Sequence, residues 1–211
     1  MVNKKDLNFE TKVIHAGQKS DPTTGAVMTP IVLASTFEQS SPGIHKGYDY
    51  SRSINPTREA FENCIASLEN GVKGYGFSSG VAAISACIEL LSPGDHVIAM
   101  DDLYGGSVRL FNEIKTISQG IEVSYVDMTN VDNIKANLKE NTKMIFVETP
   151  TNPLLKVADL SKIARLAKAN KILTVCDNTF ASPFNQQPID HGFDIVIHSA
   201  TKYLGGHSDL I

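Results

Sequence analysis

The pattern of hydrophobic and polar positions changes near residue 56. Beyond it, short apolar runs alternate with longer segments whose apolar residues recur every three or four positions. The short runs predict buried strands, and the longer period predicts amphipathic helices. Strands separated by helices favour an α/β fold, with a mostly parallel sheet covered by helices on both faces. The expected strands are 74–78, 96–100, 121–127, 143–148, 172–177 and 194–198, and the expected helices are 80–91, 105–117, 130–139 and 159–169.

Residues 1–55 lack sustained periodicity and are rich in Pro, Gly, Ser and Thr. This composition predicts an extended N-terminal arm. The first helix is expected to begin at Asn55-Pro56, because Asn caps helix starts and Pro suits the first helical position. Helical spacing of apolar residues continues as far as Asn70, and Gly71 then ends the helix.

Composition and charge narrow the classes of protein to consider. The chain has 211 residues, of which 42% are hydrophobic and 20% are charged, as is typical of a globular domain with one sizeable core. The net charge is −4 and no dense Lys/Arg stripe occurs, so we expect a small-molecule partner and no nucleic acid. No apolar run could span a bilayer and no signal-peptide core is present, so we expect no membrane association and a cytoplasmic location.

The cysteines and histidines do not suggest a metal site or disulfides. Cys64, Cys87 and Cys176 are far apart and lie in apolar periodic segments, which favours reduced thiols in the core. The six histidines show no spacing of a metal-ligand motif.

The stretch "SATKYLGG" places Lys202 just after the apolar run 194–199. In open α/β sheets ligands bind at the carboxyl ends of strands, so this lysine amine is a candidate site residue. Most lysines only face solvent, and the assignment therefore depends on other groups that reach the same edge. Asp177 ends the preceding apolar run 172–177, with one strand between it and the lysine. An isolated aspartate there would more commonly form a turn.

The segment around Ser79-Gly80 passes from a short strand into a helix. Free backbone N–H groups and the positive end of the helix dipole make such a start suitable for phosphate, although it can equally be a glycine turn that binds nothing. A rival interpretation is a nucleotide-binding Rossmann-type module, because Gly74, Gly76 and Gly80 form a loose glycine fingerprint. That fingerprint requires a complete strand before its first glycine.

Together a lysine amine, a strand-end carboxylate and a phosphate cradle are the groups that pyridoxal phosphate needs. The lysine bonds to its aldehyde, and the carboxylate keeps its ring nitrogen protonated. Tyr104, on a loop after the strand 96–100, could stack on the ring or simply face solvent. The sequence therefore predicts pyridoxal phosphate as cofactor.

The chain also resembles the pyridoxal-phosphate enzymes of cysteine and methionine metabolism, which include cystathionine γ-synthases, cystathionine γ-lyases, cystathionine β-lyases and methionine γ-lyases. The resemblance is carried, in family order, by "YDYSRSINPTR", "FSSGVAA", "DDLYGGSVRLF", "VETPTNP", "VCDNTFASP" and "HSATKYLGGHSD". It implies a fold-type I, aspartate-aminotransferase-like large domain over 56–211. It also implies that the arm, 1–55, contributes to the site of a neighbouring subunit in a homo-oligomer, a tetramer built as a dimer of dimers.

The resemblance implies roles for individual residues. Lys202 would bond to the cofactor, Asp177 would pair with the ring nitrogen and Tyr104 would stack over the ring. Arg109 and Asn152 would line the substrate side. Phosphate contacts would come from Ser79, Gly80, Val81, Ser199 and Thr201, and across the subunit boundary from Tyr50 and Arg52.

The implied activity is elimination or replacement at Cβ or Cγ of sulfur amino acids, of the cystathionine γ-synthase or γ-lyase type. Cystathionine β-lyase or methionine γ-lyase activity is the alternative. Gly106 counts against methionine γ-lyase, because those enzymes tend to carry a cysteine two positions after the stacked tyrosine. Family members continue into a smaller C-terminal domain that binds the substrate carboxylate. We therefore expect the 211-residue chain to be an incomplete form of such an enzyme.

Overall fold

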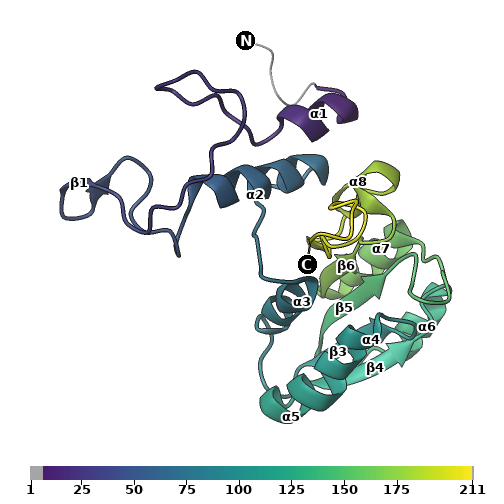
Figure 1. The fold of residues 1–211 in the computed structure, drawn as a ribbon. Helices are drawn as coiled ribbons and strands as arrows, with labels where there is room; N and C mark the ends of the chain where they lie inside the picture. The colour runs from purple at the N-terminus through teal and green to yellow at the C-terminus, as the bar shows by residue number, and fades with distance from the viewer. Residues whose placement is uncertain (1–6, 211) are drawn as a thin grey trace. The chain divides into compact units, whose positions relative to one another are not determined.

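The computed structural model describes residues 7–210 and shows two compact units (Figure 1). The first unit ends at Gly76 and the second begins at Phe77.

The first unit consists of the arm and one longer helix. Its elements are α1 (Phe9–His15), β1 (Gln39–Ser41), β2 (Ile44–His45) and α2 (Pro56–Leu68). The predicted start of α2 is confirmed, since the Asn55 side chain accepts the N–H of Thr57 and Pro56 occupies the first helical turn. The short helix α1 and the β1–β2 hairpin were not predicted, because neither has a long enough apolar pattern to be recognised.

The predicted strand 74–78 is wrong, because these residues belong to no helix or strand. Gly74 instead packs against α2: a Cβ at this position would lie 2.1 Å from the carbonyl oxygen of Glu62. Without a strand before the first glycine, the dinucleotide-binding fingerprint lacks its required setting.

The second unit is built on a five-stranded sheet in the order β4-β3-β5-β6-β7, in which every neighbouring pair is parallel. This confirms the predicted α/β class. Each expected strand from residue 96 onward is present, with small changes at its ends. The strands are β3 (His96–Met100), β4 (Glu122–Val126), β5 (Thr142–Glu148), β6 (Leu173–Asp177) and β7 (Ile195–Ile197).

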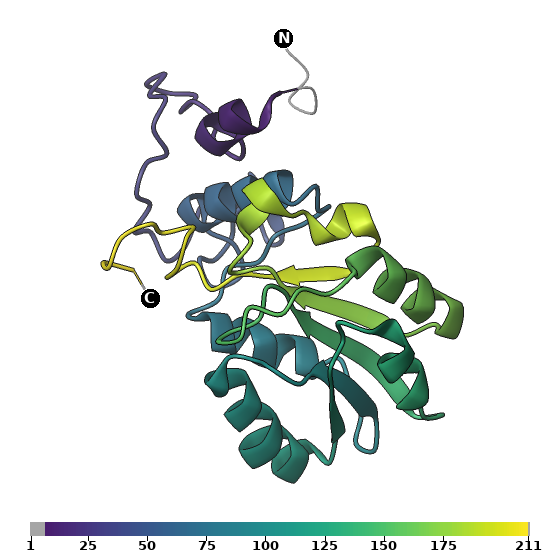
Figure 2. The same ribbon diagram turned by 90° about the vertical axis from the view of Figure 1, so that its right-hand side faces the viewer.

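Helices cover both faces of this sheet. In Figure 2, α6 and α7 lie together on one face, and α3 lies with the helical stretch from α4 to α5 on the other. The expected helix 105–117 is present as this continuous stretch, whose middle third is a π-helix. The helices of the unit are α3 (Gly80–Ile88), α4 (Gly105–Arg109), the π-helix η2 (Leu110–Lys115), α5 (Thr116–Gln119), α6 (Val131–Ala136), α7 (Leu160–Asn170), α8 (Ser182–Asn185) and the 3-10 helix η3 (Pro188–His191).

The core of the second unit is formed by the strands and the helix faces that cover them. Every residue of β3 is buried, and in β5 the four apolar residues 144–147 are fully buried. Burial on both faces explains why these strands have continuous apolar runs with no alternation. No helix within residues 7–210 is long and apolar enough to cross a membrane. In the same range no three His, Cys, Asp or Glu side chains gather as metal ligands.

Candidate functional site

The candidate site lies at the carboxyl ends of the central strands of the second unit. Parallel pairing places Glu148, the last residue of β5, beside Asp177, the last residue of β6. Asp177 in turn pairs with Ile197 at the end of β7. The chain segments that follow these three strands therefore emerge at one edge of the sheet, where open α/β sheets bind ligands.

Asp177 is only 7% exposed. Its Oδ1 accepts hydrogen bonds from the backbone N–H (3.0 Å) and the hydroxyl (2.5 Å) of Thr179. Burial raises the pKa of Asp177, and the bonds from Thr179 and the Coulombic attraction of His198 offset that rise only in part. A buried carboxylate of this kind gains stability from a cationic partner. Because both bonds end on Oδ1, Oδ2 is the oxygen that remains for such a partner.

Thr179 joins Asp177 to the segment that follows β7. Its hydroxyl donates to Asp177 and accepts the backbone N–H of Ser199 at 2.9 Å. One oxygen atom thus connects the buried carboxylate with the segment that carries the candidate lysine. Sequence reasoning did not single out Thr179, although the order Asp-Asn-Thr after a strand is the signal of an Asx turn.

The start of α3 reaches the same segment. Ser79 caps the helix, because its hydroxyl accepts the N–H of Ala82 at 3.1 Å. Gly80 and Val81 occupy the first turn, whose N–H groups have no acceptor within a helix. A Cβ at Gly80 would lie 3.0 Å from Cβ and 3.1 Å from Cα of Ser199, so a side chain here would fill the space between the helix start and Ser199.

Lys202 lies in the turn that follows Ser199 and is exposed. Its backbone N–H bonds to the Ser199 carbonyl at 3.2 Å, and its carbonyl accepts the N–H of Gly206 at 2.9 Å. Gly205 is required by close packing, since a Cβ there would lie 2.7 Å from the carbonyl oxygen of Ala200. Thr201 is the intervening residue of this turn. The predicted lysine, serine and threonine thus share one short turn, which begins at Ser199, two residues after the end of β7.

Tyr104 precedes α4 in the loop after β3, and its backbone N–H donates to Oε2 of Glu148 at 2.9 Å. Its ring lies against Gly106, where a Cβ would be 2.3 Å from Cε1 of the ring. Sequence reasoning also missed Glu148. An acidic residue at the end of the run "MIFVE" was a signal, because a charge that terminates a buried strand needs partners there.

Burial raises the pKa of Glu148 to about 8, and the nearby charges of Asp177 and Asp102 add to this rise. Hydrogen bonds from the backbone N–H groups of Tyr104 and Asn152 act in the opposite direction but are weaker. The carboxyl group of Glu148 is therefore mainly protonated at neutral pH.

Asn152 lies on a loop and Arg109 lies in a helix, and each of these segments follows the carboxyl end of a strand. Asn152 is half-buried in the loop after β5, which Asp102 holds by accepting the Thr151 hydroxyl and the N–H of Leu154, the latter at 2.9 Å. Arg109 is exposed at the end of α4.

Tyr50 and Arg52 belong to the first unit and are close to one another. The guanidinium carbon of Arg52 lies 5.0 Å from the centroid of the Tyr50 ring. The Tyr50 backbone forms a bridge with Thr36, and the carbonyls around Arg52 accept hydrogen bonds from Arg58. The arm therefore presents an aromatic ring and a cation together.

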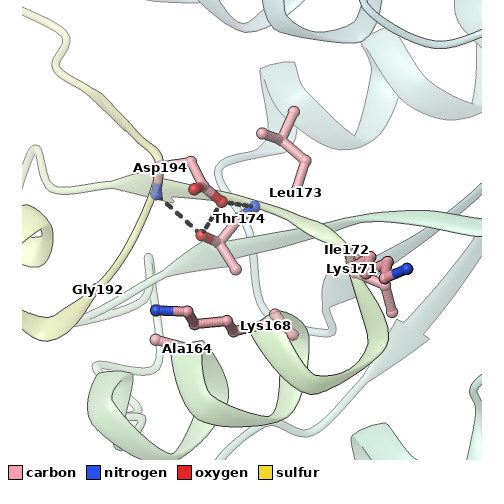
Figure 3. Close-up of a pocket in the computed structure, with 9 residues that line it drawn as sticks. Ala164, Lys168, Lys171, Ile172, Leu173, Thr174, Gly192 and Asp194 are labelled. Carbon is pink, nitrogen blue, oxygen red and sulfur yellow. Dashed lines mark hydrogen bonds between the residues drawn. The ribbon is translucent and has the colours of Figure 1, made fainter.

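A separate hollow of about 410 Å³ lies at the opposite end of the sheet (Figure 3). Here the backbone N–H and hydroxyl of Thr174 both donate to Oδ2 of Asp194, at 2.9 and 2.8 Å. None of the predicted site residues lines it. Its lining is Ala164, Ala167, Lys168, Lys171, Ile172, Leu173, Thr174, Gly192 and Asp194.

Comparisons with known proteins identify the family. Residues 10–211 match the family described as Cys/Met metabolism PLP-dependent enzyme. The chain is 57% identical to a cystathionine β-lyase of Coxiella burnetii over 209 residues, which cover 99% of this chain and 54% of that protein. It is 48% identical to a probable cystathionine γ-synthase of Herpetosiphon aurantiacus over 206 residues, covering 98% of this chain and 64% of the relative.

The fold has close structural relatives as well. The crystal structure of a cystathionine γ-lyase from Lactobacillus plantarum, complexed with L-serine, superimposes with a TM-score of 0.94 at 49% identity. The match covers 97% of this chain and 53% of that one. The chain thus spans about half the length of most of the proteins it matches.

The donor groups at the sheet edge fit pyridoxal phosphate, the cofactor of this family. Its phosphate requires hydrogen-bond donors, and the start of α3 and the Ser199 segment supply them. The two segments approach each other at Gly80, where a Cβ would fill the space between them. Its aldehyde requires an amine, and Lys202 follows in that segment. Its ring nitrogen requires a carboxylate, and Asp177 is tied to the segment through Thr179. The chain belongs to the family of Cys/Met metabolism PLP-dependent enzymes.

Proposed function

We propose that the protein catalyses elimination or replacement at Cβ or Cγ of sulfur amino acids, as in transsulfuration. The family match and the names of the relatives support this reaction class. The observation that carries it is the Thr179 hydroxyl, which joins the strand-end carboxylate of Asp177 to the Ser199–Lys202 segment, beside the start of α3.

In the proposed site pyridoxal phosphate supplies an electron-withdrawing ring that stabilises negative charge at the substrate α-carbon. Lys202 would hold the cofactor through Nζ and would also serve as the base that takes the proton from the substrate α-carbon. Oδ2 of Asp177 would keep the ring nitrogen protonated, and burial would make that ion pair stronger than it would be in water. Tyr104 would offer an aromatic face to the ring.

The phosphate is held by the helix start and by the segment after β7. Backbone N–H groups of Gly80 and Val81 donate from the first turn of α3, where the helix dipole also favours an anion. The hydroxyls of Ser79, Ser199 and Thr201 complete the proposed set. Asn152 lies on the loop after β5 and Arg109 lies in α4, which follows the loop after β3, and we assign both to the substrate side.

The proposal extends to assembly. Residues 56–211 form the cofactor-binding part of the chain, and the arm, 1–55, brings Tyr50 and Arg52 to the phosphate of a neighbouring subunit in a tetramer made of two dimers. The pairing of an aromatic ring with a cation on the arm supports this assignment. So does the exposure of apolar side chains along it, including Met28, Ile31 and Leu33. Three free cysteines suit the reducing cytoplasm in which we place the enzyme.

Substitution of Lys202 tests the proposed chemistry. Lys202→Ala should remove the yellow colour of the cofactor-loaded enzyme and nearly all turnover, without loss of the fold, because an exposed side chain contributes little packing. Borohydride reduction of the wild-type enzyme followed by peptide mapping should place the label on the peptide that contains Lys202. Label on another lysine, or normal turnover by Lys202→Ala, would contradict the assignment.

The reaction class leaves open whether the substrate reacts at Cβ or at Cγ. We propose the γ-synthase or γ-lyase type. Cystathionine β-lyase is the second candidate, because the relative from Coxiella burnetii, at 57% identity, carries that name. With cystathionine as substrate, β-elimination yields homocysteine and pyruvate, whereas γ-elimination yields cysteine and 2-oxobutyrate. Formation of cystathionine from an O-acylhomoserine and cysteine would identify a γ-synthase. Chromatography of the products distinguishes the three.

Mixing of inactive subunits tests the shared site. If Tyr50 and Arg52 serve a neighbour, Arg52→Ala and Lys202→Ala subunits of the full-length protein should regain part of the activity when they exchange. Exchange demonstrated by mass spectrometry without any recovery would argue against a site built from two subunits.

A further inference from the structure

Glu148 occupies an unusual position for a carboxyl group. It ends β5 directly after four fully buried apolar residues and is itself only 5% exposed. Burial of a carboxyl is costly unless hydrogen bonds compensate for the lost water. The groups that hydrogen-bond to its carboxyl oxygens therefore indicate what an acidic residue does at the end of β5.

The partner that the geometry shows is the backbone of a candidate site residue. Oε2 of Glu148 accepts the N–H of Tyr104 at 2.9 Å. Tyr104 belongs to the loop after β3, whereas Glu148 ends β5. One buried side chain thus bonds the end of β5 to the loop that carries the proposed stacking residue.

The backbone of Tyr104 is held from its other side as well. Its carbonyl accepts the N–H groups of Ser107 and Val108, at 2.8 and 3.3 Å, where α4 begins. Glu148 fixes the amide end of the same residue. The Cα of Tyr104, from which the ring extends toward Gly106, is thereby restrained at both peptide groups.

A second carboxyl makes the reverse connection between the same loops. Asp102 lies after β3 and accepts hydrogen bonds from Thr151 and Leu154 in the loop after β5. Beside it, Lys156 of that loop forms an ion pair with Asp101 at 2.7 Å. The two loops are therefore connected by Asp102 and Lys156 as well, but among these groups it is Glu148 that bonds to the backbone of a candidate site residue, Tyr104.

We propose that Glu148 is a positioning residue, whose buried carboxyl group fixes the backbone of Tyr104 and so sets the position of the stacking ring. The inference rests on the proposed function for the role of Tyr104, but the restraint on its backbone does not. Asp177 and Asp102 are the charged groups that face the carboxyl, from β6 and from the loop after β3. Because both are acidic, a neutral acceptor suits this place.

Two substitutions of Glu148 separate positioning from charge. Glu148→Gln keeps an acceptor oxygen and the size of the protonated acid, whereas Glu148→Met keeps the volume but removes the acceptor. Glu122→Gln, at an exposed carboxylate on β4, serves as the control for loss of one acidic group. All three are made in the full-length protein.

The first measurement uses the protein without cofactor. In Glu148→Met, amide hydrogen exchange at Tyr104 should be at least about tenfold faster than in the wild type, because an amide that loses its acceptor opens more easily. Glu148→Gln and Glu122→Gln should exchange at the wild-type rate. Wild-type protection in Glu148→Met would overturn the proposal, as would loss of protection in a folded Glu148→Gln. If Glu148→Met does not fold, the glutamine variant decides alone.

The second measurement uses the cofactor-loaded enzyme. Glu148→Met should lower kcat about tenfold or more and change the visible circular dichroism of the cofactor, while Glu148→Gln should restore both. A chain that binds no pyridoxal phosphate would refute the proposed function yet leave the exchange result intact. Faster exchange in Glu148→Met with unchanged kcat and dichroism would refute the positioning role alone.

Discussion

Substitution of Thr179 by valine tests how strongly the site depends on one hydroxyl. Valine keeps the β-branched shape and removes the oxygen that donates to Asp177 at 2.5 Å and accepts from Ser199 at 2.9 Å. A hydrogen bond to a charged group contributes about 1.5–3 kcal/mol, and a donor left without a partner costs about 1–3 kcal/mol when buried. Thr179 and Ser199 are half-buried, so water recovers part of this loss. We expect the free energy of unfolding to fall by about 2–3 kcal/mol.

Cofactor binding should weaken in the same variant. Ser199 begins the segment that carries Lys202, and without the Thr179 hydroxyl it loses its connection to the Asp177 carboxylate. If the lost hydrogen bonds weaken the binding free energy of pyridoxal phosphate by only ~1.4 kcal/mol, its Kd rises tenfold. The valine variant should also have a higher Asp177 pKa than the wild type, because the hydroxyl bond from Thr179 lowers that pKa and is lost, while the backbone bond is kept. A titration followed by visible absorbance measures the Kd, and urea unfolding measures the stability.

Thr179→Ser is the matched control, because it keeps the hydroxyl and removes only a methyl group. It should retain the wild-type Kd within about threefold, which corresponds to ~0.65 kcal/mol. If the valine variant binds the cofactor and resists urea as well as the serine variant does, the hydroxyl does not join the two parts of the site and the reasoning fails.

Three further substitutions probe the packing and the charge of this edge. Gly80→Ala should raise the Kd for pyridoxal phosphate roughly tenfold or more by titration, because its Cβ would lie 3.1 Å from the Ser199 backbone and overpacking costs about 1–3 kcal/mol; an unchanged Kd would show that the two segments can separate freely. Gly106→Ala should displace the Tyr104 ring, whose Cε1 would lie 2.3 Å from the new Cβ, and so lower kcat with little change in Tm; a wild-type kcat would mean that the ring position is unimportant. The pKa of Glu148 is about 8 in the folded protein and has the ordinary value of 4.5 in the unfolded chain, so between these values the folded state binds more protons. The free energy of unfolding should therefore fall as pH rises from 4.5 to about 8, by no more than about 5 kcal/mol. In unfolding measured across this range without cofactor, Glu148→Gln should flatten that slope, and an identical slope in both proteins would contradict the raised pKa.

The local pattern of the sequence determined most of the second unit. Continuous apolar runs such as 143–148 predict strands buried on both faces, and their alternation with helices leads to a parallel sheet. Asn55-Pro56 determined the start of α2 because capping depends only on neighbouring residues. The same reasoning placed Lys202 and Asp177 at the carboxyl edge, since parallel strands bring their carboxyl ends to one side.

Only the tertiary structure decided features that depend on distant partners. The alternating run 74–78 has the composition of a strand but forms none, because strand structure requires a neighbouring strand, and Gly74 packs against α2 instead. Thr179 and Glu148 acquire their roles from groups 20 and 44 positions away in the chain. Sequence spacing indicates which residues reach an edge. Which hydrogen bonds form there depends on how the loops fold over it, and no local pattern encodes that.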